Sequence, residues 1–114
     1  MTISSSFIEK NSAVILMRDN IPIAFYGLIC PSLPSPAYLE HLWVEPAWIG
    51  RGFGSTLFKM ACSYAADKRY KSVDLLADPN SEGFYSRHGA IKIDEVHGKV
   101  IDVKRILPKM SLSL

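Results

Sequence analysis

Cysteine and histidine are scarce in this sequence, and no two of them stand at a metal-binding spacing. The 114 residues include two cysteines, Cys30 and Cys62, and three histidines, His41, His88 and His97. Without a short Cys/His repeat the sequence predicts no metal site. Two isolated thiols are more typical of buried cysteines in a reducing cytoplasm than of a disulfide.

Long apolar runs and targeting signals are also lacking. No run approaches the ~20 apolar residues that a membrane-spanning helix needs. Residues 1–6 are polar and uncharged, unlike the start of a secretory signal peptide. We therefore expect a cytoplasmic protein.

Neither positive nor negative charge is in large excess. The net charge is +2, from 13 Lys and Arg against 11 Asp and Glu, and no basic run stands out. That pattern does not predict binding to nucleic acid. The chain is 48% hydrophobic and 21% charged, which is typical of a globular protein, and we expect residues 1–114 to form one domain.

Glycine is concentrated in one turn that follows an apolar segment. Residues 38–44 are largely apolar, and Pro46 then leads to Gly50, Gly52 and Gly54 ahead of a helix-compatible run. A glycine-rich turn before a helix lets a ligand approach the backbone, and the helix start offers free N–H groups. This arrangement predicts a site for a phosphate or pyrophosphate.

Two familiar phosphate motifs do not fit this turn. No Lys-Ser or Lys-Thr follows the glycines, as a P-loop requires. A dinucleotide fingerprint fails as well, because Ser55 and Leu57 stand where its third glycine would be. The remaining pattern, G-x-G-x-G before a helix, is also compatible with a plain strand-to-helix corner.

The hydrophobic pattern predicts a mixed α/β fold with the order β-β-β-α-β-α-β-β. Strands are expected at residues 13–18, 21–30, 38–44, 72–77, 90–96 and 100–107, and helices at 53–70 and 81–88. Residues 1–12 are Ser-rich, and we expect them to be poorly ordered or to form a short helical turn around Phe7 and Ile8. The strand–helix–strand unit implies a right-handed crossover, with residues 38–44 and 72–77 pairing in parallel or splaying apart.

A second motif, D-P-N-S-E-G-F-Y-S-R-H-G-A, runs from Asp78 to Ala90. Together with L-x-V-x-P and R-G-F-G-S, it resembles the two cofactor motifs of the GNAT (Gcn5-related N-acetyltransferase) family. The closing residues 105–108 are similar to the closing strand of a bacterial subgroup, and the resemblance covers residues 13–108. One departure is Ile49, which stands where the family usually has Gln or Arg.

The resemblance implies a GNAT-like acyl-CoA N-acyltransferase fold that uses acetyl-CoA as co-substrate without a metal. The implied reaction is acetyl transfer to a primary amine by direct attack in a ternary complex. A non-catalytic acyl-CoA-binding module, acting as a sensor or partner subunit, is the alternative. A nucleotide-phosphate binder of another class is a third hypothesis.

The resemblance also assigns cofactor-binding residues. Backbone groups near the end of the third strand would hold pantetheine, the glycine turn would hold the pyrophosphate, and the second motif would reach the pantetheine arm and the sulfur. These residues are Leu42, Val44, Gly50, Arg51, Gly52, Gly54, Ser55, Asn80 and Tyr85.

Two residues are candidates for proton transfer. Tyr85 occupies the position at which the family has a general acid that protonates the CoA sulfur; the alternative is a core tyrosine. Alternation along residues 38–44 places Glu40 on the same face as Leu42 and Val44, with His41 and Trp43 opposite. In the family, the side chain two residues before this pantetheine-binding pair reaches toward the acceptor, so the resemblance makes Glu40 our candidate base for the amine. The alternative is an exposed carboxylate at the start of a strand.

Family members usually have a strand and two helices before the first hairpin, and those helices wall the acceptor site. The dozen residues that precede residue 13 are too few for that unit. We therefore expect a homodimer or another partner to complete the acceptor wall. The candidate exposed edges are residues 13–18 and 100–107.

Overall fold

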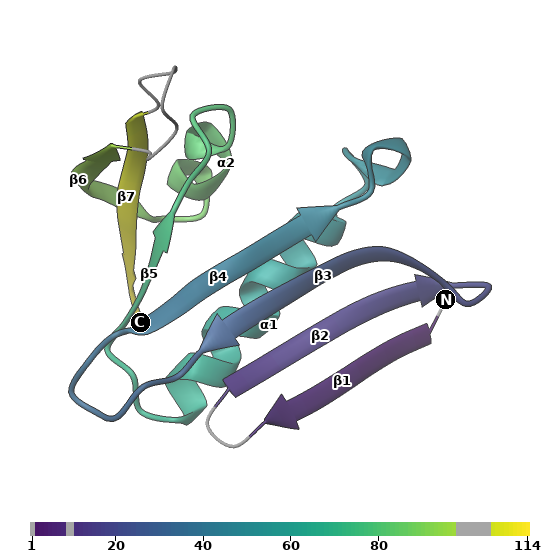
Figure 1. Ribbon diagram of the computed structural model, residues 1–114, viewed down its shortest axis with the longest axis horizontal. Coiled ribbons are helices and arrows are strands. Elements are labelled where there is room, and N and C mark those ends of the chain that lie inside the picture. The colour runs from purple at the N-terminus through teal and green to yellow at the C-terminus, as the bar shows by residue number, and fades with distance from the viewer. Residues whose placement is uncertain (1, 9–10, 98–105) are drawn as a thin grey trace.

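The structure, a computed structural model, describes residues 2–8, 11–97 and 106–114. Its elements form one mixed seven-stranded sheet with two α-helices, which confirms the predicted fold class (Figure 1). The strand order in the sheet is β1-β2-β3-β4-β5-β7-β6. The elements are β1 Thr2–Ile8, β2 Asn11–Arg18, β3 Ile21–Ile29, β4 Ala37–Val44, the 3-10 turn η1 Pro46–Trp48, α1 Phe53–Asp67, β5 Ser72–Leu76, α2 Glu82–Arg87, β6 Ile91–His97 and β7 Ile106–Ser113.

The N-terminal segment differs from its prediction, because Thr2–Ile8 is a strand and not a frayed end or a helical turn. It pairs antiparallel with β2, from Thr2 opposite Met17 to Ile8 opposite Asn11. Serine-rich composition predicts a loop, but pairing with a neighbouring strand overrides that weak local preference. The segment at residues 13–18 is consequently not an edge of the sheet.

The C-terminal strand is also displaced from its predicted position. It runs over Ile106–Ser113, between β5 and β6, while the expected strand residues 100–105 and the turn at Gly98 lie outside the described residues. Pro108 suggests a strand end because it has no N–H, yet its carbonyl accepts a hydrogen bond from the Ala77 amide at 2.9 Å. Among the described residues the edges of the sheet are β1 and β6, so the predicted edge at residues 13–18 is wrong. The other predicted edge, residues 100–107, lies mostly outside the described residues.

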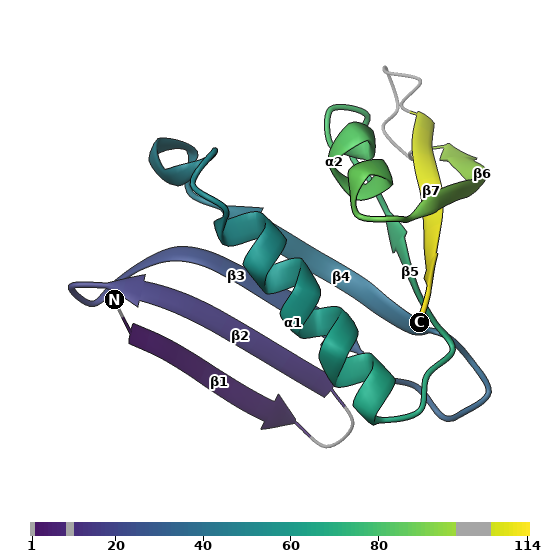
Figure 2. The same ribbon diagram turned by 180° about the vertical axis from the view of Figure 1, so that it is seen from behind.

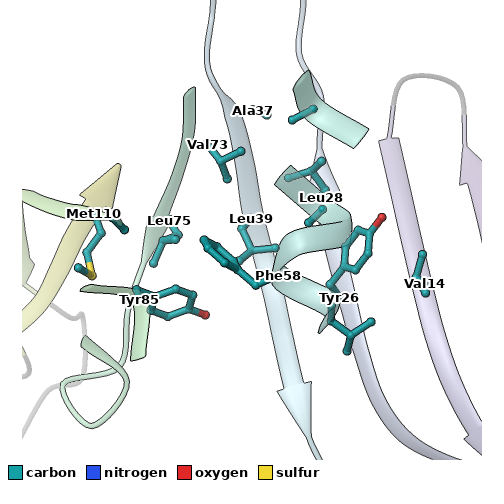
Figure 3. Close-up of a cluster of buried hydrophobic side chains, with 14 of the residues drawn as sticks. Val14, Tyr26, Leu28, Ala37, Leu39, Phe58, Val73, Leu75, Tyr85 and Met110 are labelled. Atoms are coloured by element: carbon teal, nitrogen blue, oxygen red, sulfur yellow. The ribbon is translucent and has the colours of Figure 1, made fainter. Parts of the chain in front are cut away.

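Helix α1 covers one face of β2, β3 and β4 (Figure 2). Leu57, Phe58 and Ala61 are fully buried on that side of the helix, as expected of an amphipathic helix. They meet alternate residues of the strands, among them Tyr26, Leu28 and Leu39 (Figure 3). Within the described part of the chain, no helix has the length and apolar character that a membrane crossing needs.

Strands β4 and β5 pair in parallel for a short distance and then diverge, so both predicted alternatives, pairing and splaying, occur in different parts of the strands (Figure 1). Their parallel pairs run from Ala37 with Val73 to Leu39 with Leu75. Immediately beyond, β4 carries a bulge: Leu39 pairs with Leu28 and His41 with Gly27, so that Glu40 is the extra residue. The bulge and the splay together open the sheet at one point.

Candidate functional site

A cleft of about 680 Å³ occupies the opening beside the splayed end of β4. It is bordered by the end of β4, the loop through η1, the start of α1, the turn before α2, and α2 itself. All of the predicted cofactor residues line it except Arg51. Those lining residues are Leu42, Val44, Gly50, Gly52, Gly54, Ser55, Asn80 and Tyr85.

The glycine turn presents bare backbone to this cleft. Gly50 and Gly52 have φ angles of +86° and +84°, which side chains disfavour, and a Cβ on either would meet nothing within 4 Å. Gly52 is the N-cap of α1, and no side chain caps the amides of the first helical turn. The site therefore combines open space with backbone donors and the positive end of a 15-residue helix, which suits an anion.

Gly54 has closer neighbours than the other two glycines. A Cβ there would lie 3.5 Å from the Phe84 ring and 3.6 Å from the Val44 side chain, in ordinary contact. Gly54 therefore marks the place where β4, α1 and α2 meet at the base of the cleft.

A cation–aromatic cluster stands at the glycine turn. Both Arg18 and Arg51 place their guanidinium groups over the Trp48 ring, 4.9 Å and 4.6 Å from its centroid. Trp48 itself lines the cleft and packs edge-on against Phe53, with the ring centroids 5.9 Å apart. Sequence reasoning missed Arg18 and Trp48, because only the fold brings the end of β2 beside this turn.

Tyr85 is buried in the wall of the cleft, with 8% of its surface exposed. Its ring packs edge-on against Phe58 and Phe84, with centroid distances of 5.4 Å and 5.2 Å, and Figure 3 shows it beside Leu75. Burial raises the pKa of the hydroxyl to about 12. Tyr85 is therefore protonated at neutral pH and can donate a proton or a hydrogen bond.

Asn80 sits in the turn that begins the second motif. The Asp78 side chain accepts a hydrogen bond from the Asn80 amide at 3.0 Å, and its carbonyl accepts one from the Ser81 amide at 2.8 Å. Asp78 therefore shapes the turn, while Asn80 is exposed and lines the cleft. An amide side chain placed there can both donate and accept hydrogen bonds.

Glu40 does not line this cleft. Its carboxylate is half exposed, lies 3.8 Å from His41 Nε2, and borders a separate hollow of about 160 Å³. The bulge interrupts the alternation that predicted a shared face with Leu42 and Val44, so that spacing argument was wrong. His41 and Trp43 do lie on the opposite face, where both contact the Phe25 ring.

The two cysteines are separate thiols. Cys30 is buried and Cys62 half buried, and both are free. Burial raises the pKa of the Cys62 thiol to about 11. Among the residues that the structure describes, no group of His, Cys, Asp or Glu could hold a metal ion.

Comparison with known proteins identifies a family. Residues 2–99 match the acetyltransferase (GNAT) domain. No curated protein matches the chain.

Solved structures with the same fold are numerous. A GCN5-related N-acetyltransferase from Rhodopseudomonas palustris has a TM-score of 0.77 at 20% identity, over 91% of this chain and 62% of that one. A structure from Bacillus anthracis in complex with acetyl coenzyme A has a TM-score of 0.81 at 18% identity, over 94% and 64%. An aminoglycoside 6′-N-acetyltransferase complexed with coenzyme A has a TM-score of 0.79 at 14% identity, over 92% and 73%. At these identities the likeness is one of fold. The chain spans less than two thirds of the length of the first two of these proteins.

Proposed function

Because the chain belongs to the GNAT acetyltransferase domain family, we propose that it transfers the acetyl group of acetyl-CoA to a primary amine. The observation that carries the proposal is the cleft, which joins an open glycine turn at a helix start to a buried, protonated tyrosine. The two structures with bound acetyl-CoA or CoA support acetyl-CoA as the co-substrate. The two free thiols suit a reducing compartment, and we expect the protein in the cytoplasm.

In this proposal the acetyl-CoA molecule lies along the free edge of β4. The amides of Gly50, Gly52, Gly54 and Ser55 hold the pyrophosphate, and Arg51 adds positive charge beside it. Beyond Leu39, β5 no longer pairs with β4, which leaves the backbone of Leu42 and Val44 available on that edge. The amides of pantetheine can then bind this edge as an added strand would. Asn80 faces the same arm from the opposite wall.

The chemistry is a direct attack in the ternary complex. The neutral amine adds to the thioester carbon, the tetrahedral intermediate collapses, and the C–S bond breaks as the amide forms. Tyr85 gives its proton to the departing CoA sulfur, which is a better leaving group once protonated. The attacking nitrogen loses its extra proton to solvent, and solvent restores the proton of Tyr85. The amine must lose a proton before it attacks, since a lysine-type amine has a pKa near ~10.4. Glu40 is the proposed base, because it is the first residue past the last β4–β5 pair.

A second function, binding acyl-CoA without turnover, is favoured by one observation: the proposed base lies outside the cleft, in a hollow of its own. Release of the CoA thiol from acetyl-CoA over a panel of amines separates the two functions. A protein that gains thermal stability with acetyl-CoA but releases no thiol with any amine is a binding module. The protein's own thiols add little background, because Cys30 is buried and the pKa of Cys62 is about 11.

We also propose a homodimer. The edges available for it are β1 and β6, and the face of the sheet opposite α1 exposes Ile15 and Trp43 on either side of Phe25. Light scattering over a concentration series tests this proposal. A monomer at every concentration, with full activity on a small amine, would refute it.

A further inference from the structure

A hydrogen bond links the start of α1 to the end of α2. The Ser55 hydroxyl oxygen lies 2.8 Å from His88 Nε2, and His88 Nδ1 lies 2.8 Å from the Phe84 carbonyl oxygen. Ser55 lines the proposed cofactor cleft, whereas His88 lies behind it and borders a different hollow. The serine hydroxyl is therefore the bridge between the cleft and the imidazole.

The direction of these hydrogen bonds follows from the chemistry of the partners. A carbonyl only accepts, so His88 Nδ1 carries a hydrogen and donates it to Phe84. In a neutral imidazole Nε2 is then bare, and it accepts the Ser55 proton. In that state the serine has no proton to offer to a ligand in the cleft.

The ring is held in place on both sides. The Phe84 ring lies 4.5 Å and the Phe58 ring 5.6 Å from the imidazole, centroid to centroid. The hollow behind it is also bordered by Lys59 of α1, Arg87 of α2, Cys62 and Leu112 of β7. Burial raises the pKa of the Cys62 thiol to about 11, so that thiol is uncharged. Of the groups that border the hollow, the imidazole is the one with a bare ring nitrogen that can take up a proton.

We propose that Ser55 and His88 form a relay that couples binding of the cofactor's pyrophosphate to uptake of one proton. The inference depends on the proposed position of the pyrophosphate at the α1 start. Solvent supplies a proton to His88 Nε2, which then donates to Ser55 Oγ instead of accepting from it. The serine keeps its own proton and turns it toward a phosphate oxygen. His88 is thus a positioning residue that sets the direction in which Ser55 donates.

The relay predicts that affinity for the diphosphate rises as pH falls. A hydrogen bond to a charged partner is worth more than one between neutral groups, so we expect a change on the order of tenfold between pH 8.5 and pH 5.5. Dephospho-CoA is the appropriate probe. It retains the diphosphate but lacks the 3′-phosphate monoester, whose own ionisation near pH ~6 would otherwise contribute a slope.

Isothermal titration of the whole protein with dephospho-CoA across this pH range tests the relay. Repeating the titration near pH 6.5 in two buffers of different ionisation enthalpy measures the protons taken up. His88→Gln keeps a polar side chain that does not titrate, and Ser55→Ala removes the hydroxyl; both should bind with a flat pH profile and no proton uptake. His41→Gln, which changes an exposed histidine on the other face, should keep the wild-type slope.

Binding by the wild type with no pH slope and no proton uptake overturns the relay, and so does a wild-type slope that persists in His88→Gln. The first of these outcomes needs no variant, so it overturns the relay even if a variant fails to fold. A wild type that binds neither CoA nor dephospho-CoA at any pH refutes the proposed cofactor site, and the relay with it. The two failures are therefore distinguishable.

Discussion

The cleft beside α2 and the hollow at the β4 bulge are built differently, although both adjoin the point where β4 leaves β5. The cleft is about 680 Å³, draws on two helices, a strand and two loops, and contains a tyrosine whose pKa is raised to about 12. The hollow is about 160 Å³, is lined by β2, β3 and β4, and carries Glu40 with half of its side chain exposed. Of the two candidate residues, Tyr85 in the cleft is buried and Glu40 in the hollow is not.

Under the proposed function, the two regions serve different substrates. The proposed cofactor cleft is lined by backbone that glycine and the Asp-Pro-Asn turn shape locally. The proposed amine site would need walls that enclose a substrate, and the described residues around Glu40 provide an open hollow instead. We therefore expect variants in the cleft to have larger effects than variants at the bulge.

The largest effect is expected from a negative charge in the glycine turn. Gly52→Asp should abolish stabilisation by acetyl-CoA, because its carboxylate would enter the open space of the proposed pyrophosphate site. The wild type should gain about 2.7 kcal/mol at ~100 times the dissociation constant. Thermal unfolding with and without acetyl-CoA measures the difference.

Two matched variants separate charge from backbone strain in this test. Gly52→Asn has nearly the same shape as Asp and tolerates a positive φ, so it should keep part of the stabilisation. Ser63→Asp adds the same charge on the exposed side of α1 and should behave as the wild type. Full stabilisation of Gly52→Asp would contradict the pyrophosphate assignment.

The second effect concerns Tyr85, the proposed acid. Tyr85→Phe should lower kcat by ~10²–10⁴-fold and leave acetyl-CoA affinity nearly unchanged, because the proton is transferred only in the transition state. Since the pKa is raised to about 12, Tyr85 stays protonated and imposes no loss of activity below the alkaline range. Steady-state kinetics and titration with acetyl-CoA measure the two quantities.

Tyr38→Phe is the matched control, since Tyr38 is a half-buried tyrosine on β4 that does not line the cleft. It should retain near wild-type kcat. If Tyr85→Phe does the same, Tyr85 is a packing residue and the proton for the sulfur comes from elsewhere.

Much of the fold could be predicted because its signals are local. The β2–β3 hairpin follows from the Asp19-Asn20 turn, both residues having positive φ, and α1 follows from its apolar spacing. The ends of the chain could not be predicted in the same way. Thr2–Ile8 becomes a strand only through its pairing with β2, and Ile106–Ser113 continues through Pro108 because that carbonyl, not an amide, makes the bond to Ala77.

The candidate site likewise has features with a local sequence signal and features that only the fold creates. Glycines and the Asp-Pro-Asn turn mark the cleft in the sequence, since each imposes a backbone geometry that few other residues allow. The contact of Arg18 with Trp48 depends on the fold and has no sequence signal. The bulge at Glu40 likewise cannot be predicted from the alternation of apolar and polar residues. A single extra residue in a strand changes the face to which the following side chains point.

A smaller and pH-dependent effect is expected at the bulge. If Glu40 removes the proton from the amine, Glu40→Gln should lower kcat, and the loss should shrink as pH rises and the free amine becomes abundant. A pH–rate profile of the variant and the wild type measures this trend. Glu95→Gln, an exposed glutamate on β6, should leave the profile unchanged. A loss that does not vary with pH would indicate that Glu40 positions the amine and that another group takes its proton.

The smallest effect is expected from the two arginines that flank Trp48, because exposed charges in water contribute only ~0.2–1 kcal/mol each. Arg51→Gln should weaken CoA binding about two- to fivefold and dephospho-CoA binding less, if Arg51 reaches the adenosine 3′-phosphate. Arg18→Gln should act in the same direction, and the effect of both should diminish in high salt. Arg69→Gln, at the far end of α1, is the control for a lost positive charge. Titrations of Arg51→Gln with CoA and dephospho-CoA decide among the outcomes. If binding of both ligands is weakened equally, Arg51 lies at the pyrophosphate. If binding of neither ligand is weakened, Arg51 is solvated beside Trp48.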